Sequence, residues 1–290
     1  MFAGSLVAIV TPFKKGRVDE RALGDLIEFQ IANGTDGIVP CGTSGESATL
    51  TYAEHNRVIE FTVEAAKHRV PVIAGTGSNS TDEAITLTKH AKQAGADGAL
   101  LICPYYNKPT QEGLYRHYKA IAEAVDLPLV VYNIPSRTSV NMLPATVARL
   151  ASIGNVVAIK EGAGSLGQVS EIIQACQDRI TVLAGDDALT LPMMAVGAKG
   201  VITVTANIAP ADMAALVDAF AAGRLDRAKA LHYKLYPLFT ALFCETNPIP
   251  VKEALGMMGK IEPELRLPLC PMSAENRDKL AGSMKAYGLL

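Results

Sequence analysis

Val156-Val-Ala-Ile-Lys160 is an apolar run that ends in a lysine, and Glu161-Gly-Ala-Gly164 follows it at once. A short run of this kind, rich in β-branched residues and bounded by glycine, predicts a buried β-strand. A cation at the end of such a strand is poorly solvated, so its ammonium form is disfavoured and its amine becomes nucleophilic near neutral pH. Lys160 is therefore a candidate to form a Schiff base with a carbonyl compound. The alternative is a strand-end lysine whose side chain reaches water.

A second apolar run, Pro128-Leu-Val-Val-Tyr132, comes earlier in the chain and continues as Asn133-Ile-Pro-Ser-Arg137. Short β-rich segments like these alternate with helix-length amphipathic segments through the first three quarters of the sequence. This alternation is typical of parallel strands joined by helical crossovers. Eight strands are expected, at residues 5–10, 36–40, 71–75, 97–102, 128–132, 156–160, 180–184 and 200–204. Because these strands are almost continuously apolar, a closed parallel barrel is favoured over a half-exposed sheet.

Three related segments support this strand count: Asn33-Gly-Thr-Asp-Gly37, Ala94-Gly-Ala-Asp-Gly98 and Val196-Gly-Ala-Lys-Gly200. In each of them, the first glycine is placed to cap a helix, and an apolar strand begins at the second. The spacing of the segments corresponds to whole numbers of βα units of roughly thirty residues each. The sequence thus predicts an α/β fold, a (β/α)8 TIM barrel.

The strand pattern ends near Pro210, and only helical periodicity remains after it. Helices are expected at residues 211–222, 225–243, 248–258 and 273–287. The first would be the eighth barrel helix, and the other three would form a C-terminal helical appendage. We place the boundary at Gly223, so that residues 1–223 form a catalytic barrel and residues 224–290 form a C-terminal helical domain.

Composition excludes several classes of protein. Hydrophobic residues make up 49% of the 290 positions and charged residues 19%, which is typical of a compact globular chain. The formal net charge of -2 and the lack of a basic stripe argue against nucleic-acid binding. No apolar run reaches the ~18 residues of a membrane helix, and the N-terminus lacks a signal-peptide pattern. A cytoplasmic protein without membrane association is expected.

The cysteines and histidines predict neither disulfides nor a metal centre. The cysteines are odd in number and widely spaced, which favours buried free thiols in a reducing cytosol; they are Cys41, Cys103, Cys176, Cys244 and Cys270. No Cys-x-x-Cys motif is present, and the histidines never stand at metal-ligand spacing. We therefore expect no metal in this protein.

Polar side chains follow several of the predicted strands. In a (β/α)8 barrel, catalytic groups lie at the C-terminal strand ends, so an amine, several hydroxyls and one guanidinium are expected to converge there. Gly42-Thr-Ser-Gly45 offers backbone amides and two hydroxyls that suit a small carboxylate, but an ordinary helix-capping turn has the same pattern. Tyr132 could equally fill the barrel, and Arg137 could be a solvated loop cation. Tyr105-Tyr106 could lie at a subunit contact.

Three of these motifs together carry a resemblance. Cys41-Gly-Thr-Ser-Gly-Glu46, Tyr132-Asn-Ile-Pro-Ser-Arg-Thr138 and Ile159-Lys-Glu161 resemble the signatures of the pyruvate-dependent class I aldolase/lyase superfamily. The match is most similar to the dihydrodipicolinate synthase family and covers nearly the whole chain. Two further segments also fit it, Val201-Ile-Thr-Val-Thr-Ala-Asn207 and Asn247-Pro-Ile-Pro-Val-Lys252. The combination is specific, although each motif alone is not.

The resemblance implies a reaction and its catalytic residues. Lys160 would form a Schiff base with pyruvate, without any cofactor, and the enamine derived from it would attack L-aspartate 4-semialdehyde in the diaminopimelate route to L-lysine. Tyr132 would be the general acid/base, and Thr43 and Tyr106 would complete a hydroxyl relay to solvent. Tyr106 would come from the neighbouring subunit of a homotetramer built as a dimer of dimers.

Substrate-binding residues follow from the same resemblance. Thr43 and Ser44 would hold the pyruvate carboxylate, and Arg137 would bind the carboxylate of the semialdehyde through its planar guanidinium. Gly185 and Ile202 would line the site near the lysine with backbone groups. The family more often has threonine where this chain has Ser44, so a hydroxyl is kept and only a methyl group is lost.

The family also has a regulatory site for L-lysine at its tight dimer interface. The matching positions here are Ser47, Ala48, His55, Asn79, Glu83 and Tyr105. Glu83 would pair with the ammonium group of the inhibitor, and Asn79 and Tyr105 would hydrogen-bond its other polar groups. Alternatively, His55 and Glu83 are solvated residues on helix faces. Tyr52 stands where some lysine-sensitive relatives have histidine, which leaves the strength of inhibition open.

Two other functions remain open. The chain could be another pyruvate-dependent aldolase, such as N-acetylneuraminate lyase or a keto-deoxy-sugar-acid aldolase. Arg137 argues against this, because polyhydroxylated substrates need several hydroxyl-binding groups rather than one carboxylate clamp. The chain could also be a non-catalytic relative that binds pyruvate, but such a protein would normally have lost the lysine, the tyrosine or the relay.

Overall fold

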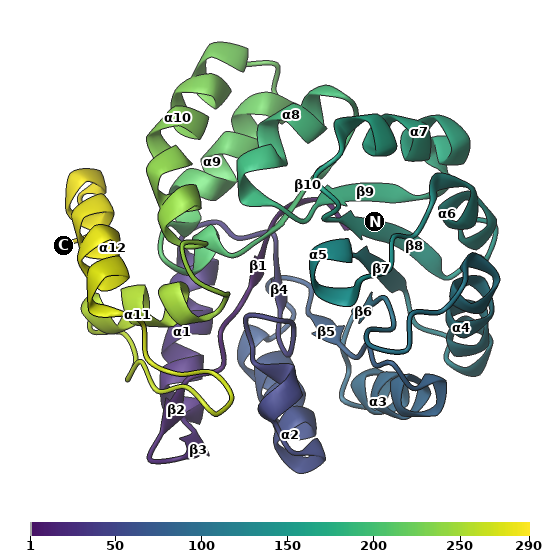
Figure 1. Cartoon of the computed structure of the whole chain (residues 1–290), viewed down its shortest axis with the longest axis horizontal. Coiled ribbons are helices and arrows are strands. Elements are labelled where there is room, and N and C mark those ends of the chain that lie inside the picture. Colours follow the sequence, from purple (N-terminus) through teal and green to yellow (C-terminus); the bar gives the residue numbers. More distant parts are fainter. Residues whose placement is uncertain (1) are drawn as a thin grey trace.

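Eight parallel strands form a nearly closed barrel at the centre of the molecule, for which a computed structural model describes residues 2–290 (Figure 1). The strands are β1 (Gly4–Ala8), β4 (Gly37–Val39), β5 (Ile73–Gly75), β6 (Gly98–Ile102), β7 (Leu129–Asn133), β8 (Val156–Glu161), β9 (Thr181–Ala184) and β10 (Gly200–Thr203). Their order in the sheet is β4-β1-β10-β9-β8-β7-β6-β5. All eight predicted strands are confirmed, with ends that differ slightly from those expected.

Hydrogen bonds between β4 and β5 bring the two edges of the sheet together. The amide of Ile38 donates to the carbonyl of Pro71 at 2.9 Å, and the amide of Gly75 donates to the carbonyl of Pro40 at 2.9 Å. Because neighbouring strands pair in parallel, their C-terminal ends meet at one end of the barrel. This is the end at which the sequence predicts the catalytic groups.

Alternation along the strands separates two layers of buried side chains. Side chains that point into the barrel form one cluster, which includes Leu6, Val39, Leu100, Val130 and Ile202. Side chains that point outward pack against the surrounding helices in a larger cluster, which continues into the C-terminal helices. Burial on both faces explains why the strands are continuously apolar in the sequence.

Helices cover the outside of the barrel (Figure 1). They are α1 (Glu20–Ala32), α2 (Tyr52–Ala66), α3 (Thr81–Gln93), α4 (Gln111–Ala124), α6 (Pro144–Leu150), α7 (Leu166–Cys176), α8 (Thr190–Ala195) and α9 (Pro210–Ala221). The short helix α5 (Pro135–Thr138) lies instead at the C-terminal end of the barrel, directly after β7 (Figure 1). Short 3-10 helices stand at Ser47–Thr49, Gln177–Arg179, Asp187–Leu189 and Thr205–Asn207. Local signals fix some of their ends. At the start of α2, for example, Thr51 and Glu54 form a reciprocal capping box.

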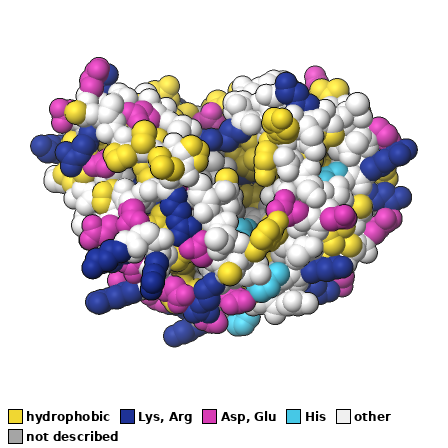
Figure 2. All heavy atoms as spheres, turned by 60° about the horizontal axis from the view of Figure 1, so that its bottom comes forward, with side chains coloured by type: hydrophobic (Ala, Val, Ile, Leu, Met, Phe, Trp, Pro, Cys, Tyr) yellow, Lys and Arg dark blue, Asp and Glu magenta, His cyan; other side chains and the backbone are white. Residues whose placement is uncertain are grey.

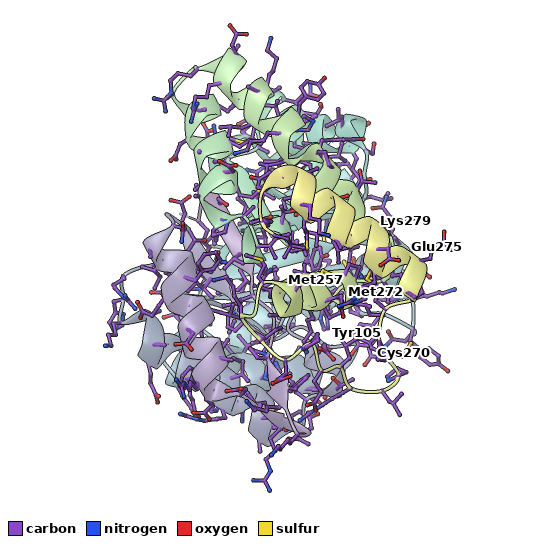
Figure 3. All side chains as sticks on the ribbon, turned by 90° about the vertical axis from the view of Figure 1, so that its left-hand side faces the viewer. Tyr105, Met257, Cys270, Met272, Glu275 and Lys279 are labelled. Atoms are coloured by element: carbon purple, nitrogen blue, oxygen red, sulfur yellow. The ribbon has the colours of Figure 1, made fainter. Side chains whose placement is uncertain are left out.

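Three more helices follow the barrel, as the periodicity predicted: α10 (Leu225–Ala241), α11 (Ile249–Met257) and α12 (Ala274–Tyr287). On the exposed side of α12, Glu275 and Lys279 form an ion pair at 2.7 Å (Figure 3). The predicted boundary at Gly223 falls in the turn between α9 and α10, and the division into two domains stays a prediction. None of the helices in residues 2–290 has the length and apolar composition needed to cross a membrane.

Two features differ from the expectations. A short hairpin of β2 (Phe13–Lys14) and β3 (Arg17–Val18) lies between β1 and α1. It was not predicted, because two-residue strands leave no periodic pattern. The prediction that all five cysteines are buried is wrong for Cys244 and Cys270, which are exposed. They lie in the connections on either side of α11, where the chain runs over the surface.

Candidate active site

A cavity of about 540 Å³ lies at the C-terminal ends of the barrel strands. Six of the predicted catalytic and substrate-binding residues line it: Thr43, Ser44, Tyr132, Arg137, Lys160 and Gly185. They come from the connections after β4 and β9 and from the ends of β7 and β8 and the short helix α5, and the segment before α11 completes the wall. Figure 2 shows a face of the molecule that is hollowed near its middle, with hydrophobic side chains along the rim.

Lys160 is buried near the end of β8 and lines this cavity. Its Nζ atom lies 4.3 Å from the centroid of the Tyr132 ring. Burial lowers the pKa of the Lys160 amine to about 8; the charge of Arg137 adds to this effect, and the carboxylate of Asp187 opposes it. A substantial fraction of the amine is therefore neutral near pH 8, as a Schiff-base nucleophile requires. The alternative of a lysine that reaches out to water is not what the structure shows, since Lys160 as a whole is only 6% exposed.

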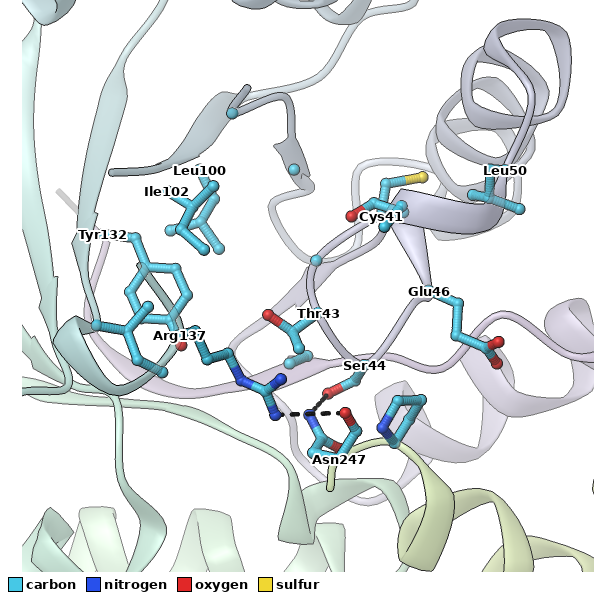
Figure 4. A pocket seen from close by; sticks show the side chains of 18 of the residues that line it. Cys41, Thr43, Ser44, Glu46, Leu50, Leu100, Ile102, Tyr132, Arg137 and Asn247 are labelled. Atoms are coloured by element: carbon cyan, nitrogen blue, oxygen red, sulfur yellow. Dashed lines mark hydrogen bonds between the residues drawn. The ribbon is translucent and has the colours of Figure 1, made fainter. Parts of the chain in front are cut away.

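Tyr132 lies beside Lys160 on β7, and the two residues are direct partners in the parallel register. Burial raises the pKa of the Tyr132 phenol, and the charge of Arg137 partly opposes this. The phenol therefore keeps its proton near neutral pH and can donate it. Thr43 lines the same cavity (Figure 4), and the hydroxyl relay that would join it to Tyr132 stays a prediction.

The loop at residues 41–46 carries Thr43 and Ser44, and a distant part of the chain holds it. The Nδ2 atom of Asn247 donates a hydrogen bond to Oγ of Ser44 at 3.0 Å (Figure 4). The Nη2 atom of Arg137 donates to the carbonyl of Asn247 at 3.3 Å. The two groups predicted to bind the two substrate carboxylates are thus connected through one asparagine.

A buried ion pair anchors the same loop. Nζ of Lys252 in α11 lies 2.5 Å from Oε1 of Glu46, and both side chains are inaccessible to solvent. The backbone amide of Arg266 donates to Oε2 of Glu46 at 3.3 Å, and the ring of Phe13 lies 4.2 Å from Nζ of Lys252. Loss of one partner would leave an uncompensated buried charge. The C-terminal helices therefore help to fix the loop that carries Thr43 and Ser44.

The cavity continues toward α2 and α3, where five of the residues predicted to bind lysine line it: Ser47, Ala48, His55, Glu83 and Tyr105. Oγ of Ser78 and the hydroxyl of Tyr52 both donate to the Glu83 carboxylate. These bonds lower its pKa, so it carries a negative charge near neutral pH. His55 is buried, and its Nε2 atom lies 2.9 Å from the carbonyl of Gly75. The alternative that His55 is a solvated residue is therefore wrong.

Three predicted site residues do not line the cavity. Tyr106 follows β6 on a loop with a φ of 71° and is 89% exposed, so its hydroxyl does not reach the site of its own chain. Ile202 in β10 is buried inside the barrel. Asn79 lies outside the cavity wall, and its carbonyl accepts a hydrogen bond from Nδ2 of Asn107 at 2.9 Å.

Sequence reasoning missed two residues beside the site. Asn247 belongs to a motif that was noted, but 203 positions separate it from Ser44. Asp187 is buried two positions after Gly185, and its Oδ2 atom accepts hydrogen bonds from the amide and the hydroxyl of Thr205 at 2.7 and 2.6 Å. Its place just after a strand was the only signal in the sequence.

Comparison with known proteins agrees with this architecture. The model of the Dihydrodipicolinate synthetase family matches residues 1–287. The 4-hydroxy-tetrahydrodipicolinate synthase of Syntrophobacter fumaroxidans is 66% identical over 291 residues and all of both chains. The structure of dihydrodipicolinate synthase from Aquifex aeolicus has a TM-score of 0.98 and 55% identity over 99% of each chain. That of the enzyme from Cyanidioschyzon merolae with lysine bound has a TM-score of 0.96 and 41% identity, over 100% of this chain and 99% of that one. The chain therefore belongs to the dihydrodipicolinate synthetase family.

Proposed function

We propose that this chain has 4-hydroxy-tetrahydrodipicolinate synthase activity, a lyase activity that condenses pyruvate with L-aspartate 4-semialdehyde in the diaminopimelate route to L-lysine. Full-length relatives with that name support the assignment. The observation that carries it is the buried amine of Lys160, which has a lowered pKa and lies against the ring of Tyr132 at the wall of the cavity.

The first half of the reaction activates pyruvate. The neutral amine of Lys160 attacks the keto carbon, and the keto oxygen leaves as water to give an iminium ion. The proton of the buried Tyr132 phenol assists this loss, and a relay through Thr43 and Tyr106 restores it from solvent. The iminium nitrogen then draws electrons from the pyruvate methyl group, which loses a proton to form an enamine. Because the iminium is the electron sink, the reaction needs no cofactor.

The second half joins the two substrates. The enamine carbon attacks the aldehyde carbon of L-aspartate 4-semialdehyde, and a new carbon–carbon bond forms. The π bond of the aldehyde opens, its oxygen takes up a proton from the Tyr132 phenol to become a hydroxyl group, and the enamine returns to an iminium ion. The amine of that substrate then displaces Lys160 from the adduct, which closes a ring, frees the lysine and releases the cyclic product. Thr43 and Ser44 hold the carboxylate of pyruvate, and the guanidinium of Arg137 binds the carboxylate of the semialdehyde.

The full site needs a second chain. Tyr106 lies outside the cavity of its own chain and is exposed, which supports a contribution of its hydroxyl to the cavity of a neighbouring subunit. We infer a homotetramer built as a dimer of dimers, and we place it in the cytoplasm, where a biosynthetic enzyme of this kind would find its substrates.

The part of the cavity beside Glu83 is the proposed regulatory site for L-lysine. Its charged carboxylate suits the ammonium group of that amino acid, and Tyr105 offers a hydroxyl on the same wall. The solved relative with lysine bound supports a site for this ligand in the family. Inhibition by this end product would then lower the flux through the pathway as the concentration of L-lysine rises.

A pair of coupled assays tests the proposed function. Pyruvate with L-aspartate 4-semialdehyde should give turnover, and pyruvate with N-acetylmannosamine should give none. Turnover of pyruvate with N-acetylmannosamine, but not with L-aspartate 4-semialdehyde, would identify a different pyruvate-dependent aldolase. Pyruvate binding without turnover of either second substrate would identify a non-catalytic relative.

A further inference from the structure

Behind the catalytic pair, a second pair of side chains joins the same two strands. Tyr132 on β7 is the register partner of Lys160 on β8, and Asn133 is the partner of Glu161. Because side chains alternate along a strand, the first pair faces the cavity and the second pair faces away from it. Asn133 and Glu161 are 0% and 2% exposed, so water does not reach them.

The second pair is joined directly. One N–H of Asn133 Nδ2 donates to both oxygens of the Glu161 carboxylate, at 3.0 and 3.2 Å. The other N–H donates to Oδ1 of Asn141 at 2.8 Å, and Oδ1 of Asn133 accepts from the amide of Met142 at 2.9 Å. Every polar group of the Asn133 side chain is therefore used, and its orientation is fixed.

Glu161 has only neutral hydrogen-bond partners among the described residues. Besides Asn133, the amide of Ala163 donates to it at 2.6 Å and Nε2 of Gln168 donates at 3.2 Å. Burial raises the pKa of this carboxyl group. A buried carboxylate without a cation is a costly means of joining two strands, and local features that cost stability tend to lie at functional sites.

We propose that Asn133 and Glu161 are positioning residues that keep the phenol of Tyr132 and the amine of Lys160 at their working separation. This inference rests on the proposed function, in which both groups act on the same bound pyruvate. Each positioning residue directly follows a catalytic one, so any change in their contact is passed to the catalytic pair through one peptide bond. A misplacement of about 1 Å is enough to slow such a reaction by roughly a hundredfold.

The charge of Glu161 also affects the protonation of Tyr132. It raises the pKa of the phenol, in the same direction as burial. The other titratable groups around the phenol are Arg137 in α5, Cys103 after β6, Lys160 in β8 and Asp186 after β9. With the carboxylate replaced by a neutral amide, the phenol should lose its proton at a lower pH.

The test compares Glu161→Gln and Asn133→Ala with Asn155→Ala as a matched control. Asn155 directly precedes β8, and its Nδ2 atom donates to the carbonyls of Ala122 and Val125 at 3.0 Å each. It therefore ties down the same strand at the end opposite the cavity. The coupled assay gives kcat, the KM for pyruvate and the pH–rate profile, and urea unfolding gives the stability of each variant.

We expect kcat to fall about tenfold to a hundredfold in Glu161→Gln and Asn133→Ala, while the KM for pyruvate stays close to that of the wild type. The KM is kept because the loop with Thr43 and Ser44 is not touched. The double variant should lose no more than the worse single variant, because both changes remove one contact.

Asn155→Ala should lose stability but keep the kcat and the pH–rate profile of the wild type. Wild-type kcat in the two test variants would overturn the inference, and so would an equal loss of kcat in the control. If Glu161→Gln does not fold, Asn133→Ala alone is sufficient for the test. Its kcat should then fall while its KM for pyruvate stays close to that of the wild type. A wild-type protein without turnover would contradict the proposed function instead, so the two failures are distinct.

Discussion

Nζ of Lys160 lies 4.3 Å from the centroid of the Tyr132 ring, and the two residues are register partners on neighbouring strands. Burial favours the uncharged form of both groups, because it lowers the pKa of the amine and raises the pKa of the phenol. A nucleophilic amine and a protonated phenol therefore coexist at one place in the cavity. These are the two states in which imine formation would need them.

Imine formation with pyruvate should speed up as the pH rises through about 8. The neutral fraction of Lys160 increases as the pH passes its pKa of about 8, and only the neutral amine attacks. Borohydride trapping at a series of pH values gives the midpoint. Arg137→Gln should move it upward, because the charge of Arg137 lowers the pKa of Lys160. A wild-type midpoint at the ordinary lysine value of 10.5 would show that burial does not act on this amine.

Arg137→Ala should weaken the use of L-aspartate 4-semialdehyde while leaving the pyruvate imine intact at a pH above the lysine midpoint. Loss of a charged hydrogen bond costs about 1.5–3 kcal/mol, which corresponds to roughly a tenfold to hundredfold loss in kcat/KM for the semialdehyde. Steady-state kinetics and trapping measure the two effects separately. Arg149→Ala is the control, because Arg149 pairs with Glu112 at 2.9 Å on the outer helices. Equal loss of both steps would assign Arg137 to holding Asn247 rather than the substrate.

Tyr106 should act across a subunit contact. The variants Tyr106→Phe and Lys160→Ala should each be almost inactive alone, and mixing them should recover part of the activity. In a hybrid, one site can take Lys160 from one chain and Tyr106 from the other. Activity is measured after the subunits are dissociated and reassembled, and native mass spectrometry shows whether hybrids form. Hybrids that form without any recovery would place the two residues in the same chain's site.

L-Lysine at millimolar concentration should inhibit the wild-type protein, and Glu83→Thr should be much less sensitive. The carboxylate that the ammonium group needs is held at the cavity wall by Tyr52 and Ser78. Asp82→Thr is the matched control, because Asp82 is the exposed neighbour of Glu83 in α3. Activity titrations with lysine decide between the outcomes. If the wild type does not respond, or if Glu83→Thr responds as the wild type does, the site is not a lysine site.

The sequence predicted most of the fold because its apolar runs are local and regular. Val156–Glu161 and Leu129–Asn133 are strands, and the functional groups at their ends meet in one cavity because parallel strands end together. Contacts that depend on the return of the C-terminal helices to the barrel could not be predicted. The pairs Asn247–Ser44 and Lys252–Glu46 join residues about 200 positions apart, and periodicity carries no information on such contacts.

The position of a residue relative to a strand did not always predict whether that residue lines the cavity. Tyr106 follows β6 in the sequence, but the left-handed backbone of its loop leaves it on the surface rather than in the cavity. Ile202 was expected to line the site through its backbone, but the chain reaches the cavity wall only two residues later, at Val204 after β10. A residue type and its distance from a strand do not determine these positions.

The site of covalent attachment tests the central claim most directly. The protein is incubated with pyruvate and borohydride and digested, and the peptides are analysed by mass spectrometry. We predict a reduced pyruvate adduct on Lys160 and none on Lys252, which is also buried but is paired with Glu46. An adduct on a different lysine, or an active protein without any adduct, would contradict the account.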